Sequence, residues 1–240
     1  MIEIEIACNS LTSCQNAIDG GASRIELFEN LHDGGCTPAS SMIHVASKLS
    51  LPVYVMIRPR GGHFIYSNLE IDMMLHDIEV CKNAKVSGIV FGCLNSEGQI
   101  DHWLNKKLLD AWNGPATFHR AIDRANDIME AAKQITSLGF ERILSSGGAI
   151  SADEGLHNLR KLQKEYGKHI HIQPGAGITV KNAAMILRET GCMSLHATCK
   201  ATKTTNPGKF NPKFSSLDTE TFSEVEEIRE LVNAARPHKH

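Results

Sequence analysis

The feature that most constrains the fold is a short apolar run that recurs eight times along the chain. The runs begin near Ile2, Arg24, Val53, Gly88, Ala116, Arg142, Ile170 and Ser194. Successive starts lie 22 to 35 residues apart, which accommodates one strand, one helix and two loops. Buried parallel strands are nearly continuously apolar, and the intervening segments carry the i, i+3, i+4 apolar spacing of amphipathic helices. The repetition predicts an α/β fold, a closed TIM (β/α)8 barrel.

One domain accounts for the chain, because 240 residues suit a single barrel and no linker divides them. We expect the barrel to occupy residues 1–236, ending in a helix from about Phe222 to Ala235, and residues 237–240 to form a disordered tail. The polar stretch 198–221 is too long for an ordinary connection. It is expected either to be mobile or to fold over the barrel mouth.

Composition excludes several classes of partner. The formal net charge of −2 gives no bulk attraction to nucleic acid or to an anionic membrane. No apolar run approaches the ~20 residues of a membrane helix, and the alternating start Met1–Ile6 is unlike a signal peptide. Seven cysteines without regular spacing are typical of a cytoplasmic protein with reduced thiols.

Charged side chains stand directly after the apolar runs. The run Ala-Thr-Phe at 116–118 leads into His119, Arg120 and Asp123. Sites in α/β barrels lie at the C-terminal ends of strands, so His119 is a candidate general acid or base. Asp123 is expected either to orient this imidazole or to pair with Arg120. The alternative for His119 is an ordinary core histidine.

The second and third runs repeat this arrangement. Glu26 lies inside the second run, and Val53–Ile57 leads into Arg58-Pro59-Arg60. Alternation along an extended Arg-Pro-Arg places both guanidinium groups on one side, where they could bind a carboxylate or phosphate. Pairing of these arginines with Glu26 or Asp123 explains them equally well. Glu26 is a candidate second base or the partner of Arg58.

Glycine-rich turns follow the sixth and seventh runs. Ser146 and Gly147 belong to the first turn, and Gly175 and Gly177 to the second. Such turns can present backbone N–H groups to an anion, although a tight turn before a helix explains them as well. His196 ends the eighth run and should face the same mouth, because strand eight lies beside strand one in a closed barrel.

Cys8, Cys36 and Cys199 are candidate metal ligands. They and Cys93 fall just after predicted strands, and therefore on the C-terminal face of the barrel. Thiolates favour soft metals such as Cu(I), whereas zinc-type ligand spacing is absent. Ordinary buried thiols are the alternative.

Several of these segments resemble the CutC family. They are Arg24–Leu27, Gly34–Pro38, Met56–Gly62, Thr117–Asp123, Arg142–Gly148 and Pro174–Ile178. The resemblance runs from about residue 2 to residue 198. It implies a cytoplasmic copper homeostasis protein with a TIM barrel, a bound copper ion and a homo-oligomeric state, taken here as a dimer. The family often has a cysteine where this chain has Phe28, and an aliphatic residue or threonine where it has Cys36, whereas Cys8 matches a family cysteine.

Three functions are therefore open. The first is copper homeostasis with Cu(I) held by Cys8, Cys36 and Cys199, with His196 as a further ligand. The second is an enzyme acting on a small anionic metabolite, with Arg58 and the other basic groups binding the anion. The third is a binding scaffold, which an aromatic content of 5% disfavours.

Overall fold

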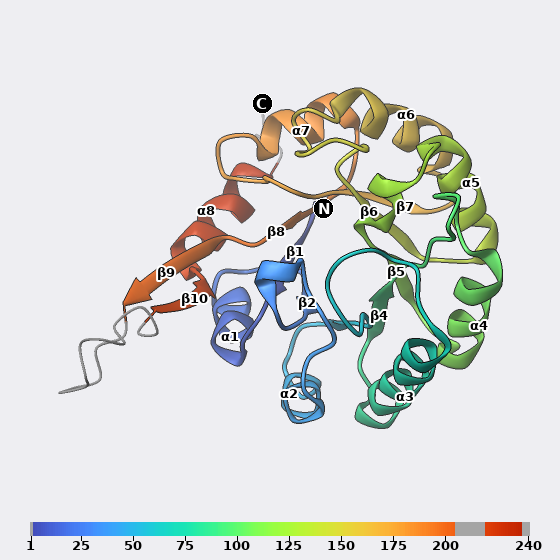
Figure 1. Ribbon diagram of the computed structural model, residues 1–240. Helices are drawn as coiled ribbons and strands as arrows, with labels where there is room; N and C mark the ends of the chain where they lie inside the picture. The colour runs from blue at the N-terminus through green and yellow to red at the C-terminus, as the bar shows by residue number, and fades with distance from the viewer. Residues whose placement is uncertain (1, 205–218, 237–240) are drawn as a thin grey trace.

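The computed structural model describes residues 2–204 and 219–236. Eight parallel strands form one sheet in the order β7-β6-β5-β4-β3-β2-β1-β8 (Figure 1). They are β1 (Glu3–Cys8), β2 (Arg24–Leu27), β3 (Val53–Met56), β4 (Gly88–Phe91), β5 (Ala116–Phe118), β6 (Arg142–Ser145), β7 (His171–Pro174) and β8 (Ser194–Ala197). The predicted TIM barrel is confirmed, and each strand begins within one residue of its predicted start.

The barrel is closed between β7 and β8 by side chains. Gln173 Nε2 donates to the Leu195 carbonyl at 3.2 Å, and Ser194 Oγ donates to the Ile172 carbonyl at 3.5 Å. All other neighbouring strands are joined by parallel backbone pairing, including β1 to β8.

Helices surround the strands as an outer ring (Figure 1). They are α1 (Leu11–Asp19), α2 (Ser40–Ala46), α3 (Asn68–Ala84), α4 (His102–Trp112), α5 (Ile128–Leu138), α6 (Leu156–Tyr166), α7 (Ala183–Thr190) and α8 (Val225–Ala234). Two short 3₁₀ helices, η1 (Leu31–Asp33) and η2 (Arg120–Arg124), lie at the mouth. Ser67 and Glu70 form a capping box on α3, and Asp127 caps α5. None of the helices in the described ranges has the length and apolarity needed to span a bilayer.

Apolar packing lies mainly between strands and helices, whereas the barrel interior combines a small apolar cluster with several buried charged side chains. Arg24 on β2 donates to Thr117 on β5 at 3.3 Å, and Arg142 on β6 to Glu3 on β1 at 2.6 Å. These strands are not neighbours in the sheet, so the contacts cross the barrel interior. Tyr54 packs against Arg24, with the guanidinium carbon 3.4 Å from the ring centroid. The interior thus departs from the branched aliphatic layers that usually fill such a barrel.

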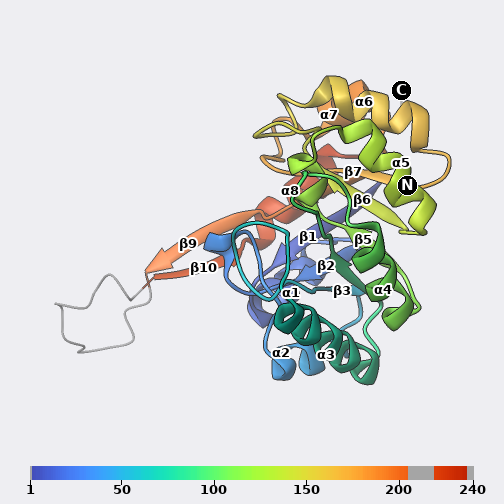
Figure 2. The ribbon, with the colours of Figure 1, turned by 45° about the vertical axis from the view of Figure 1, so that its right-hand side comes forward.

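An antiparallel hairpin interrupts the stretch predicted as a long polar loop. Strands β9 (Lys200–Thr204) and β10 (Thr219–Ser223) pair directly after β8 and extend away from the barrel (Figure 2). Residues 205–218 and the predicted tail at 237–240 lie outside the described residues. The predicted last helix is α8, which packs against α1 so closely that a Cβ on Gly20 would lie 2.4 Å from Ile228.

Candidate functional site

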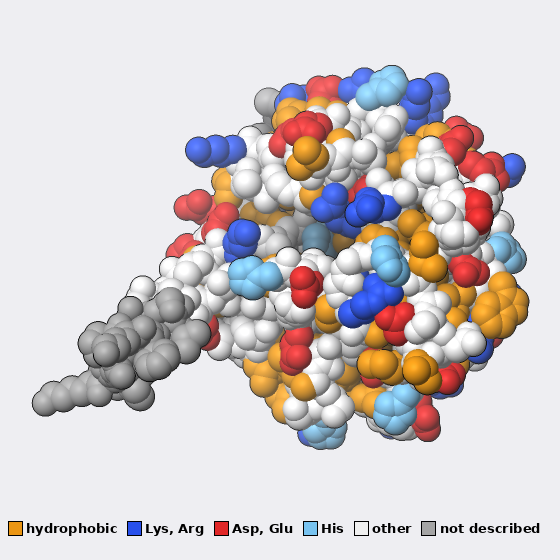
Figure 3. All heavy atoms as spheres, in the orientation of Figure 1, with side chains coloured by type: hydrophobic (Ala, Val, Ile, Leu, Met, Phe, Trp, Pro, Cys, Tyr) orange, Lys and Arg blue, Asp and Glu red, His pale blue; other side chains and the backbone are white. Residues whose placement is uncertain are grey.

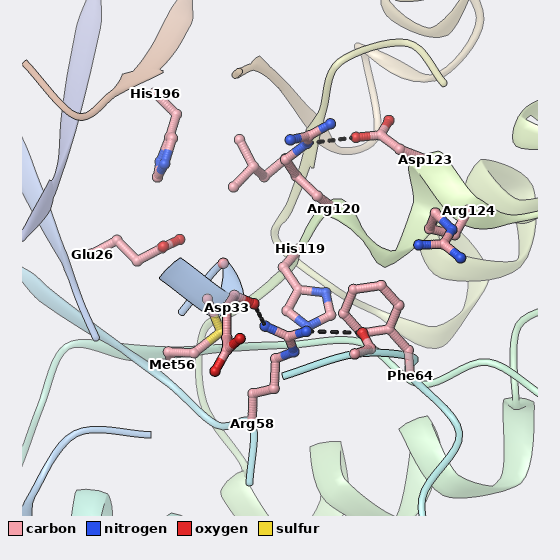
Figure 4. A pocket seen from close by; sticks show the side chains of 13 residues that line it. Glu26, Asp33, Met56, Arg58, Phe64, His119, Arg120, Asp123, Arg124 and His196 are labelled. Carbon is pink, nitrogen blue, oxygen red and sulfur yellow. Dashed lines mark hydrogen bonds and ion pairs between the residues drawn. The ribbon is translucent and has the colours of Figure 1, made fainter. Parts of the chain in front are cut away.

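The C-terminal ends of the strands surround a cavity of about 360 Å³ (Figure 4). It brings together six of the predicted site residues: Glu26, Arg58, His119, Arg120, Asp123 and His196. A neighbouring cavity of about 510 Å³ shares Glu26, Arg120 and His196 and is also lined by Gly177. Figure 3 shows this face hollowed near its centre, with basic side chains beside the hollow.

A buried ion-pair network supports the floor of the cavity. Glu5 Oε2 lies 2.6 Å from Arg24 Nε, and Glu5 Oε1 lies 2.7 Å from His196 Nδ1. Burial opposes ionisation of Glu5, but Arg24 and His196 outweigh it and lower its pKa to about 2. Burial alone would lower the pKa of His196, yet the carboxylates of Glu26 and Glu5 raise it. Glu5 is therefore a carboxylate that favours the imidazolium form of His196.

Glu26 has a different environment. Its side chain is buried, and its Oε2 atom has no hydrogen-bond partner among the described residues. Burial raises its pKa from 4.5 to about 7, because the charges of His196 and Arg24 only partly offset the lost hydration. A carboxyl group that titrates near neutrality at a cavity wall is suited to accept and return a proton.

His119 directly follows β5 and caps η2. Its Nδ1 atom accepts a hydrogen bond from the Ala121 N–H at 3.2 Å. Its Nε2 atom is buried and lacks a partner within the described part of the chain. Burial and the nearby Arg58 charge lower the pKa of His119 from 6.5 to about 3, so the imidazole is neutral.

Of the two alternatives for Asp123, orienting His119 and pairing with Arg120, the structure shows the second. Asp123 pairs with Arg120, whose Nε lies 2.9 Å from its Oδ2. It also accepts from Ser145 Oγ at 2.6 Å and from the backbone N–H groups of Ser146 and Gly148. This carboxylate anchors the turn after β6 and is not placed to catalyse proton transfer.

Arg58 is held in the cavity wall by the backbone. Its Nη1 donates to the carbonyl oxygens of Asp33 and Gly35, each at 2.7 Å, and its Nη2 donates to Gly62 at 3.0 Å. The guanidinium carbon lies 5.0 Å from the Phe64 ring centroid. Arg58 forms no ion pair with a carboxylate in the described residues, so neither Glu26 nor Asp123 is its partner.

Arg60 lies outside both cavities, contrary to its prediction as an anion ligand. Its Nε is 2.5 Å from Glu70 Oε1, and its other donors bind the carbonyl groups of Gly61, His63 and Ile65. Strand β3 ends at Met56 and the chain bends at residues 59–62, so strand alternation does not extend to Arg60.

Backbone N–H groups of the glycine-rich turns donate to other groups of the protein and are therefore not available to an anion. The Ser146 N–H donates to Asp123, the Gly147 N–H to Ser145 Oγ at 2.8 Å, and the Gly175 N–H to the Ser145 carbonyl at 2.9 Å. A Cβ on Gly147 would lie 2.3 Å from the Gly155 carbonyl oxygen. Tight packing therefore explains these glycines, and the prediction of Ser146, Gly147 and Gly175 as anion ligands is not met.

Cys8, Cys36 and Cys199 are all buried and do not meet at one point. The described residues contain one group of three or more metal-capable side chains, and it comprises Glu5, Glu26 and His196. Burial and Cys14 raise the pKa of Cys8, and burial raises that of Cys199 to about 12, so neither thiolate is favoured. The three-cysteine Cu(I) site is therefore not assembled.

The group formed by Glu5, Glu26 and His196 is not a Cu(I) site in place of the three cysteines. Its donors are hard or borderline, and Glu5 is already engaged by Arg24 and His196.

Arg24 and Phe64 were not among the predicted site residues. The sequence did mark Arg24, because it is a charged residue two positions before Glu26 in an otherwise apolar run. Two residues apart on a strand, both side chains point to the same face. Phe64 lies in a loop, and no local pattern marked it.

Comparison with known proteins identifies the family. The CutC family model matches residues 2–201. A family protein CutC from Photobacterium profundum is 39% identical over 243 residues, covering 98% of this chain and 99% of the relative. The human copper homeostasis protein cutC homolog is 41% identical over 202 residues, covering 83% of this chain and 74% of the relative.

Solved structures agree with this assignment. The crystal structure of a CutC protein from Streptococcus agalactiae aligns with a TM-score of 0.79 and 34% identity, covering 82% of this chain and 99% of that one. Phosphoribosyl anthranilate isomerase from Thermococcus kodakaraensis aligns over 98% of this chain and 99% of its own at 12% identity, with a TM-score of 0.62, and shares the fold alone. With the family model covering most of its length and relatives about 40% identical across it, the chain belongs to the CutC family.

Proposed function

We propose that this protein takes part in copper homeostasis and that its molecular activity is the binding of a small anionic compound in the barrel mouth. The first part is supported by the names of the human and mouse relatives, each 41% identical over 83% of the chain. A cytoplasmic location and a homo-oligomeric state stay predictions.

One observation carries the second part. Glu26 Oε2 and His119 Nε2 are buried polar atoms without partners among the described residues, and both residues line the same cavity. Such atoms cost about 1–3 kcal/mol each when left unpaired, so their retention favours a ligand that completes them. No carboxylate in the described chain neutralises the Arg58 guanidinium, so this cation favours a ligand that carries a negative charge.

Binding of oxalate, a small planar dianion, tests the anion proposal by calorimetry. Arg58→Gln removes the cation at the cavity wall, and Arg120→Gln removes a cation shared by both cavities. We expect each change to weaken oxalate binding at least about tenfold, the loss of one charge-assisted contact. Arg160→Gln, on the exposed face of α6, is the matched control and should bind as the wild type does. Equal affinities in all four proteins, or no saturable binding, would contradict the proposal.

Direct Cu(I) binding is tested separately. The reduced protein is titrated with Cu(I) against a chelator, alongside the triple variant Cys8→Ser, Cys36→Ser, Cys199→Ser. We expect no difference between them, because these buried thiols do not converge. A much weaker affinity in the triple variant, with the fold retained by circular dichroism, would restore the three-cysteine site.

A further inference from the structure

The hydrogen bond to His119 determines which ring nitrogen carries the proton. The Ala121 N–H donates to Nδ1, so Nδ1 presents its lone pair and the hydrogen of the neutral ring resides on Nε2. If Nδ1 were protonated, its N–H group would face the Ala121 N–H group, and two donors would repel each other. His119 is therefore held as a neutral imidazole whose free N–H is buried at the cavity wall.

Glu26 supplies the complementary group. Glu26 and His119 line the same 360 Å³ cavity, and Figure 4 shows the Glu26 carboxyl group across it from the His119 ring, which lies beside Arg58 and Phe64. The unpartnered Oε2 atom of Glu26 can therefore reach a ligand that His119 also contacts. The pKa of about 7 means that the carboxylate form is present at neutral pH and that the acid form is also accessible.

Positive charge lies beside the imidazole. Arg58 is close enough to His119 to lower its pKa, and its guanidinium is fixed by the carbonyl groups of Asp33, Gly35 and Gly62. A negative charge that develops on an oxygen bound to His119 Nε2 would meet a preorganised donor and a fixed cation.

We infer that this mouth catalyses proton transfer at the carbon next to a carbonyl group of a small anionic substrate, with Glu26 as the base and neutral His119 as the donor to the carbonyl oxygen. This inference rests on the anion binding proposed above. A carboxylate base opposite a neutral imidazole is a pairing that enzymes use for enolisation.

The reaction needs no oxidant and no second substrate. Glu26 Oε2 takes the proton, the electrons of the C–H bond form a C=C bond, and the carbonyl oxygen becomes an enolate oxygen bound to His119 Nε2–H. Return of the proton to the same carbon regenerates the substrate. In a hydroxy-carbonyl substrate, its return to the former carbonyl carbon, with a proton moving between the two oxygens, gives the isomer.

Hydrogen–deuterium exchange tests the inference. Pyruvate and dihydroxyacetone phosphate, which carry exchangeable hydrogens beside a carbonyl group and an anionic group, are incubated with the protein in D₂O. Proton NMR follows the loss of the signal from those hydrogens. We expect exchange of at least one probe above the rate in buffer, increasing as the pH rises through about 7, where Glu26 loses its proton; burial and the Glu5 charge oppose this ionisation, and the charges of His196 and Arg24 favour it.

Two variants assign the roles. Glu26→Gln removes the base at constant shape and should slow exchange about 100-fold or more, and His119→Phe keeps a ring but removes the N–H and should slow it by a similar factor. The matched controls are Glu165→Gln and His157→Gln, both exposed on α6, and they should exchange at the wild-type rate. Exchange that persists in Glu26→Gln would overturn the inference.

Oxalate binding separates the two proposals. If oxalate binds and both probes compete with it, but neither exchanges above the buffer rate, the proton-transfer inference fails and anion binding stands. If neither oxalate nor the probes bind saturably, the anion proposal fails and the inference fails with it.

Discussion

Replacing Glu26 by glutamine should stabilise the protein at alkaline pH. The folded protein holds the Glu26 proton more tightly than the unfolded chain does, because burial raises its pKa from 4.5 to about 7. The stability due to this group is therefore fully present below pH 4.5 and is lost as the pH rises through 7. Glutamine has nearly the same shape and cannot ionise, so it removes that loss.

The magnitude follows from the two pKa values of Glu26. At about 1.4 kcal/mol per pKa unit, the difference between 4.5 and about 7 corresponds to about 3 kcal/mol at pH 8. Less than a third of this stabilising free energy is already lost at pH 5. Relative to the wild type, Glu26→Gln should therefore gain about 2–3 kcal/mol in unfolding free energy between pH 5 and pH 8, or roughly 5–10 °C in Tm for a chain of this size.

Urea unfolding followed by circular dichroism at pH 5 and pH 8 measures this gain. The pKa of His196 also differs between the folded and unfolded protein, since Glu26 and Glu5 raise it against the effect of burial, so the comparison is repeated in a His196→Gln background. Glu165→Gln, exposed on α6, should follow the wild type at both pH values. An identical pH dependence in Glu26→Gln and the wild type would refute the argument that Glu26 is ionised at a cost in stability.

Three further substitutions have defined outcomes. Glu5→Gln leaves the buried Arg24 without its 2.6 Å partner and should destabilise the protein by about 3–5 kcal/mol in urea unfolding; a loss below about 1 kcal/mol would contradict this. Gly92→Ala would place a Cβ 2.8 Å from His119 Nδ1, so it should cost about 1–3 kcal/mol and weaken oxalate binding by displacing the ring. Arg60→Gln should leave oxalate affinity unchanged, since Arg60 lies outside both cavities; a tenfold loss in calorimetry would return it to the site.

The barrel could be predicted because its determinants are local and repeated. The run at Val53–Met56 is buried at every position, and the stripe Ala131, Ala132 and Ile135 is the buried face of α5. A buried parallel strand and an amphipathic helix each follow from a pattern a few residues long. The hairpin β9–β10 could not be found in this way, because its strand β9 is largely exposed and polar.

The sequence predicted the site as the set of residues at the C-terminal ends of the strands. Whether each of these residues lines the cavity depended on its tertiary contacts. Glu26, Arg58, His119 and His196 do line one mouth. Arg60 does not, because the chain bends after β3 and carries its guanidinium to Glu70.

Position along the chain thus specifies which residues reach the barrel mouth, since a strand ends at a definite residue and its C-terminal end faces one side of the sheet. Tertiary contacts alone decide the chemistry of each group. The acidic residues Glu5 and Glu26 lie on neighbouring strands, yet Arg24 lowers the pKa of one to about 2, while burial without a partner raises that of the other to about 7. Likewise, the charged cluster after β5 is recognisable in the sequence, but the contacts across the fold separate Asp123, bound to the β6 turn, from His119, a neutral imidazole with its N–H at the cavity wall. Protonation and partnership depend on distances of a few ångströms between residues remote in the chain, and those distances exist only once the barrel has closed.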